Sequence, residues 1–179
     1  MLKTLSLLLL ITTPLLFARG TYQTPEAFIQ SALGDSPVSK KVFWIDDSDR
    51  KVIEKIVNHG FKKLRVRYWQ SGLDTVWVLD EIGKEAPITI GVHVSQGKIK
   101  QTKVLIYRES RGDEVRHSFF TQQFIDATLT KDNKLDRSID SITGATLSVR
   151  AVTKMSRLAL WLDNEVIKKT LTASTTASK

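Results

Sequence analysis

The sequence of 179 residues contains no cysteine, which excludes disulfide frameworks, thiol catalysis and metal centres built on cysteine ligands. Its three histidines, His59, His93 and His117, are too few and too scattered for a histidine-rich metal site. Four prolines and nine glycines exclude collagen-like or proline-rich disordered chains, and a hydrophobic fraction of 41% excludes wholesale disorder. The composition therefore predicts one globular domain, with or without an appendage.

The start of the chain has the three parts of a secretory signal peptide. Lys3 precedes an apolar run over 5–17, and Ala18 and Gly20 place small residues at the −3 and −1 positions of a cut before Thr21. The run is shorter than the roughly 20 residues that span a bilayer, although an uncleaved membrane anchor is the alternative. We therefore expect residues 1–20 to be a signal peptide and the mature chain to be periplasmic or otherwise extracytoplasmic, with membrane association left open.

The spacing of apolar residues, together with helix-capping residues, predicts a mixed α and β structure. Helices are expected over 24–33, from 46 to about 60, over 118–127 and from about 145 onward. Strands are expected over 63–69, 75–79, 88–94 and 99–107, the last two as a hairpin, and 42–45 is a brief apolar run. The tail from Thr170 onward is expected to be disordered because it is rich in Thr, Ser and Ala. The fold class that follows is α+β, an antiparallel sheet with packed helices.

A formal net charge of +8 permits an acidic partner, whether nucleic acid, phospholipid or an anionic redox protein. The most basic segment, 62–69, alternates cations with apolar and aromatic residues, which fits a nucleic-acid surface or a docking face for an acidic redox partner. Exposed cations on an edge strand more often prevent aggregation, and an exported protein rarely meets nucleic acid. We therefore expect no nucleic-acid partner.

The segment with the clearest chemical character opens the last helix. It reads Asp140, Ser141, Ile142, Thr143, Gly144, Ala145, Thr146, Leu147, Ser148. The small residues at 144 and 145 allow a bulky group to approach the backbone, and four hydroxyls surround them. The unpaired N–H groups and positive dipole of a helix start can bind phosphate. The alternative is that Thr143 only caps the helix and Gly144 eases the turn.

The order Asp-x-x-Thr-Gly-Ala-Thr over 140–146 resembles the flavinylation motif of the FMN-binding domain family. That family includes the covalently flavinylated periplasmic subunits of the Rnf complex and of the Na⁺-pumping NADH:quinone oxidoreductase. Residues 88–99, the strand to Tyr107, Glu109 and residues 120–124 follow in the order that the family shows. The resemblance covers roughly 83–162. It implies an FMN-binding domain at 83–165, preceded by a helical and strand extension at 21–82 and followed by a helix end and disordered tail at 166–179.

The resemblance also implies a covalent cofactor. In the family, the last hydroxyl of the motif, here Thr146, carries FMN through a phosphoester bond to its side-chain oxygen. A separate exported flavin transferase, which uses FAD and magnesium, makes this bond. The other motif residues would then line the cofactor site: Asp140, Ser141, Ile142, Thr143, Gly144, Ala145, Leu147 and Ser148. Neither a catalytic residue nor a metal ligand is expected.

Residues outside the motif are candidates for contact with the flavin. Phe119, Phe120 and Tyr107 could pack on its ring. Glu109 and Arg111 follow the fourth expected strand, where the respiratory subunits commonly have an acidic residue, a Thr and a Gly-rich turn. Arg111 adds a cation near the phosphate or the flavin edge, with a solvated loop as the alternative.

The function implied is an exported flavoprotein that carries electrons between a membrane redox partner and an extracytoplasmic acceptor. One alternative is a periplasmic FMN-dependent reductase that acts directly on a ferric chelate or a quinone. Another is a module without redox function, or one that binds FMN non-covalently.

Overall fold

The computed structural model describes residues 20–177 and the side chains up to Thr170. Except for Gly20, the expected signal peptide lies outside the described residues. Within the described part of the chain, no helix is both long and apolar enough to cross a membrane.

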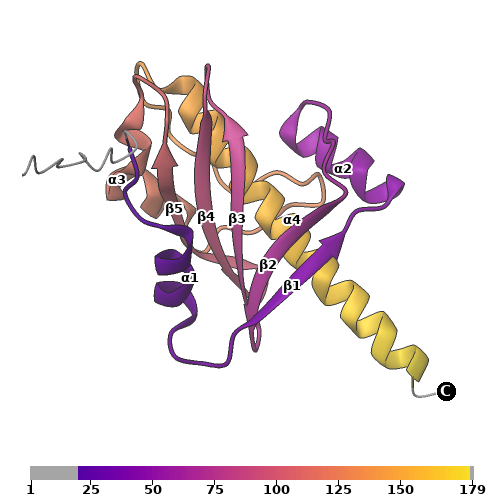
Figure 1. Cartoon of the computed structure of the whole chain (residues 1–179). Coiled ribbons are helices and arrows are strands. Elements are labelled where there is room, and N and C mark those ends of the chain that lie inside the picture. The colour runs from indigo at the N-terminus through magenta and orange to yellow at the C-terminus, as the bar shows by residue number, and fades with distance from the viewer. Residues whose placement is uncertain (1–19, 178–179) are drawn as a thin grey trace, which may run out of the picture.

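Five antiparallel strands form one sheet in the order β1-β2-β3-β4-β5, so every strand pairs with its neighbour in the sequence. The strands are β1 (Ser39–Trp44), β2 (Arg65–Ser71), β3 (Asp74–Ile82), β4 (Pro87–Ser95) and β5 (Lys98–Tyr107). The hairpin expected between the last two strands is present, and so is the α+β class (Figure 1). Short turns join β2 to β3 and β4 to β5, where Gly72 and Gly97 have positive φ, whereas the longer segment 45–64 joins β1 to β2.

Helices cover both faces of this sheet (Figure 1). The long helix α4 (Thr146–Ala177) packs on one face against β3, β4 and β5, and α2 (Asp47–Val57) lies beside it. On the other face, α1 (Pro25–Leu33) buries Phe28 and Leu33 against β3 and β5. The larger core therefore lies between α4 and the sheet, with Trp77, Ile90 and Leu158 almost fully buried.

Local capping explains where the first two helices begin. The Thr24 hydroxyl accepts a hydrogen bond of 3.1 Å from the backbone N–H of Ala27, and Pro25 takes the first helical position. In α2, Asp46 and Asp49 form a reciprocal capping box with each other's backbone N–H groups. The sequence predicted both helix starts, the first from Thr24 and Pro25 and the second from the acidic residues of its first turn.

Two expectations about helices are corrected by the structure. The tail predicted to be disordered from Thr170 is helical to Ala177, because extending an already packed helix costs little per residue. The helix predicted over 118–127 is only α3 (Ser118–Thr121) followed by a 3₁₀ turn (Gln122–Phe124). It ends there because Asp126 and Ala127 form backbone hydrogen bonds with Ile99 of β5.

The basic strand is also not an edge strand. Six residues of β1 pair with β2, from Ser39 with Gln70 to Trp44 with Arg65. In the sequence, β1 was visible only as the short apolar run 42–45, because Lys40 and Lys41 interrupt the apolar pattern in its first half. The cations of β2 therefore do not protect a free sheet edge, because β2 pairs with β1 on one side and with β3 on the other.

Candidate functional site

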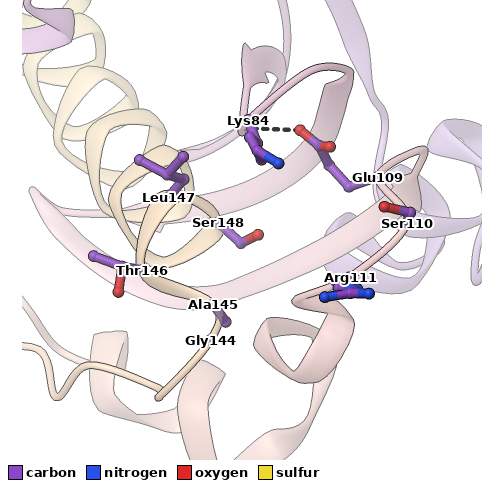
Figure 2. A pocket seen from close by; sticks show the side chains of 9 residues that line it. All are labelled: Lys84, Glu109, Ser110, Arg111, Gly144, Ala145, Thr146, Leu147 and Ser148. Atoms are coloured by element: carbon purple, nitrogen blue, oxygen red, sulfur yellow. Dashed lines mark hydrogen bonds between the residues drawn. The ribbon is translucent and has the colours of Figure 1, made fainter.

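The first turn of α4 and the loop after β5 form two sides of a pocket of about 570 Å³ (Figure 2). The structure thus brings together two sequence segments that both contained candidates. The lining residues are Lys84, Glu109, Ser110, Arg111, Gly144, Ala145, Thr146, Leu147 and Ser148. The first four motif residues, Asp140 to Thr143, lie on the approach to the helix and do not line the pocket.

A buried hydrogen-bond network holds the loop against the helix. Tyr107, at the end of β5, donates its phenol O–H to the backbone carbonyl of Arg111. The Ser148 hydroxyl lies 2.8 Å from the same phenol oxygen and can donate to it. Both side chains are buried, and burial raises the pKa of Tyr107 more than the bond from Ser148 lowers it. The Ser148 hydroxyl is therefore already used in a hydrogen bond that positions the loop.

Glu109 has a structural task at the rim of the pocket. Its Oε1 accepts hydrogen bonds from the backbone N–H groups of Lys84, Glu85 and Ala86, in the turn between β3 and β4. Partial burial alone would raise the pKa of Glu109, but the three donors outweigh it and lower the pKa. This carboxylate fixes the turn that places the Lys84 side chain at the pocket (Figure 2).

The Thr146 hydroxyl stands apart from the other polar groups of the pocket. Thr146 is exposed at the first position of α4, and its hydroxyl has no hydrogen-bond partner among the described residues. Gly144 before it has φ +83°, which lets the chain turn into the helix. The N–H groups of the first helical turn have no partner within the helix. Together with the cations of Lys84 and Arg111, these donors fit a phosphate ester.

The aromatic residues proposed to pack on a flavin ring do not line this pocket. Phe120 is fully buried and packs edge-on against Phe124, so it belongs to the core. Phe119 is exposed but lies outside the pocket lining. Tyr107 is buried and does not line the pocket either. The large apolar side chain that does face the pocket is Leu147, which is 42% exposed.

Sequence reasoning missed Lys84. The residue lies more than twenty positions before Glu109, and only the contact between the β3–β4 turn and Glu109 brings it to the pocket. Ile82 pairs with Pro87, so residues 83–86 form a tight turn, but no local pattern of residues indicates that this turn contacts Glu109.

Comparison with known protein families agrees with this geometry. Residues 83–160 match the family model of the FMN-binding domain. The chain therefore contains an FMN-binding domain. A search of curated proteins and one of solved structures gave no match.

The FMN-binding domain indicates FMN as the cofactor and a flavin-binding redox protein as the general function. Its matched residues run from the β3–β4 turn into α4 and include every residue that lines the pocket. Strands β1, β2 and β3 precede the match, yet they belong to the same sheet.

Proposed function

We propose that this chain is an exported electron carrier in which FMN is joined to Thr146 Oγ1 by a phosphoester bond. The main support is that Thr146 belongs to the pocket lining at the helix start and has an exposed hydroxyl without a hydrogen-bond partner among the described residues. Ser148 is bonded to Tyr107, and Ser141 and Thr143 lie outside the pocket lining. Among the hydroxyls of the motif, only that of Thr146 belongs to a residue of the pocket lining and also has no hydrogen-bond partner in the part of the chain that the structure describes.

Each neighbouring group has a role toward the phosphate. The N–H groups of the first turn of α4 and the positive end of its dipole bind a negative charge. Lys84 and Arg111 approach from the opposite side of the pocket and add two cations. FMN, once attached, supplies the one- and two-electron redox chemistry, while the protein holds and orients it.

The cellular setting is part of the same proposal. The leader sequence supports export, and attachment needs a flavin transferase in the same compartment, as the family implies. We propose a membrane redox protein as one electron partner and an extracytoplasmic acceptor as the other. In this setting the protein is an electron-transfer flavoprotein rather than a free-standing enzyme.

The decisive measurement is the intact mass of the protein co-expressed in the periplasm with a flavin transferase. The proposal expects a mass gain of one FMN less one water, on the peptide that contains residue 146. Thr146→Ala should carry no flavin. Thr143→Ala is the matched control, because it removes an exposed hydroxyl of the same motif that lies outside the pocket, and it should still be modified.

Two results would contradict covalent attachment at Thr146. One is an unmodified mass in the wild type, and the other is equal modification of Thr146→Ala. Release of the yellow colour on denaturation, without any mass gain, would instead support non-covalent FMN binding.

A further inference from the structure

A second concave site adjoins the first one along α4. It is a groove of about 580 Å³ between α4, α2 and the segment 134–139. Six cationic residues line this basic groove: Lys55, Lys134, Arg137, Arg150, Lys154 and Arg157. None of its lining residues within the described chain is an Asp or a Glu. Apolar side chains, including Leu135 and Val149, complete the walls.

Three of these cations lack a partner among the described residues. The side chains of Lys55, Lys134 and Arg150 make no hydrogen bond or ion pair with any described residue. They come from α2, from the connecting segment and from α4, so three separate elements converge on the groove. Like charges brought together without a counterion repel one another, and a bound anion would remove that cost.

The other three cations are held in place by bonds to the protein. Arg137 Nε lies 3.0 Å from Asp136 Oδ1, and its Nη1 donates to the backbone carbonyl of Ile125 at 3.0 Å. Lys154 forms an ion pair of 2.9 Å with the buried Glu81. Arg157 donates its Nε–H to the backbone carbonyl of Asn133 at 2.7 Å. Arg157 is half-buried, and this burial lowers the pKa of its guanidinium, since no carboxylate compensates the charge.

The groove begins next to the attachment hydroxyl. Arg150 follows Thr146 by four residues, so both lie on one face of α4, about 6 Å apart along the helix axis. Lys154 and Arg157 continue the same face by one and two further turns. A ligand in the groove would therefore lie beside a flavin anchored at Thr146.

We propose that the basic groove binds a small, multiply anionic electron acceptor, of the class of anionic ferric chelates. This inference rests on the proposed function and assigns the acceptor class to it. Lys55, Lys134 and Arg150, which pair with no carboxylate among the described residues, favour an anionic ligand. The apolar walls fit the organic part of a chelate, and the volume suits a small molecule. When FMN is fully reduced, two ferric ions gain one electron each, FMN returns to its oxidised form, and two protons are released.

Binding can be measured without any flavin. Hexacyanocobaltate(III), a redox-inert trianion, is titrated into the flavin-free Thr146→Ala chain by calorimetry at about 0.1 M salt, where distant surface charges are screened. One saturable site is expected. Lys134→Gln/Arg150→Gln should weaken binding about tenfold, because two charged donors are lost.

The matched control removes two exposed lysines elsewhere. Lys40 on β1 and Lys98 at the start of β5 lie outside the groove, so Lys40→Gln/Lys98→Gln has the same net charge as the test variant. Its affinity should stay within about twofold of the parent. Because Lys134 and Arg150 are exposed, the test variant should keep the parent's circular dichroism spectrum.

Electron transfer is then measured with hexacyanoferrate(III), which has the same charge and shape. The flavinylated, pre-reduced protein should reoxidise at a rate that saturates with hexacyanoferrate(III), and the groove variant should need about tenfold more of it. Equal affinities of the groove and control variants would overturn the inference. Loss of hexacyanocobaltate(III) binding on flavinylation would also overturn it, since the flavin would then occupy the groove. The mass result at Thr146 is independent of both outcomes.

Discussion

Gly112 allows the loop after β5 to lie against the first turn of α4. Its φ is +88°, and a Cβ atom placed there would be 2.9 Å from Ser148 Oγ and 3.0 Å from the Tyr107 phenol oxygen. Gly144 has a similar φ of +83°, but a Cβ there would meet nothing within 4 Å. The two glycines satisfy the same backbone requirement, and only Gly112 also leaves room for a neighbour.

We therefore expect Gly112→Ala to lower the free energy of unfolding more than Gly144→Ala. The shared left-handed backbone costs about 1–2 kcal/mol in either variant. Gly112→Ala must also displace the hydroxyl pair of Tyr107 and Ser148, which adds about 1 kcal/mol. Urea denaturation of both variants measures the difference, and equal losses would show that close packing at Gly112 is unimportant.

At the scale of elements, a buried carboxylate joins α4 to β3. Asp163 of α4, only 1% exposed, accepts a hydrogen bond of 2.7 Å from the Thr75 hydroxyl. The indole N–H of Trp77 donates in turn to the Thr75 oxygen at 2.9 Å. The second carboxylate oxygen of Asp163 is buried and makes no hydrogen bond of good geometry with any described residue. Burial raises the pKa of Asp163, and the Thr75 hydroxyl and the nearby backbone N–H of Gly97 lower it by less.

This arrangement predicts a pH dependence of stability. Because its folded pKa lies above the unfolded value of about 3.9, Asp163 contributes its full stability below that pH. The contribution is lost as the pH rises through the folded pKa. The free energy of unfolding of the wild type, relative to Asp163→Asn, should therefore fall as the pH is raised from about 4 to about 7.

The measurement is urea denaturation across this pH range. Asp132→Asn, which removes an exposed carboxylate without a partner among the described residues, is the matched control. A difference between wild type and Asp163→Asn that is flat, or that rises with pH, would contradict a raised pKa at Asp163.

At the scale of the whole molecule, the FMN-binding domain depends on strands that precede its family match. β3 pairs with β4 along its full length, from Asp74 with Ser95 to Ile82 with Pro87. It also contributes Val76, Trp77 and Leu79, all buried, to the two cores. Without β3, the inner face of the sheet would be incomplete and β4 would become an unprotected hydrophobic edge.

We expect a chain of residues 83–179 not to fold alone, whereas residues 20–179 do. Burial of β3 side chains supplies hydrophobic stabilisation that the shorter chain has no means to replace. Near-ultraviolet circular dichroism and urea denaturation distinguish the two. A cooperative unfolding transition in the 83–179 chain would show that the matched region is self-sufficient.

The sequence predicts a structural feature well when the residues that determine it are close together along the chain. Thr24 with Pro25, and Asp46 with Asp49, mark helix starts because capping acts within three or four residues. Alternation over 88–94 predicted β4 for the same reason, since side chains of a strand point to opposite faces in turn. The length of β1 was missed because its lysines interrupt the apolar pattern. Pairing with β2 makes these residues part of the strand all the same.

The sequence alone determined the starts of α1 and α2, strand β4, the α+β class and the motif over 140–146, because each is encoded in neighbouring residues. Only the tertiary structure decided that Ser148 is bonded to Tyr107, that Thr146 has no such bond among the described residues, and that Lys84 and Arg111 line the same pocket. It also decided that cations from three elements line one groove. These features depend on contacts between segments that are far apart in the chain, and no local pattern of residues specifies which of them meet.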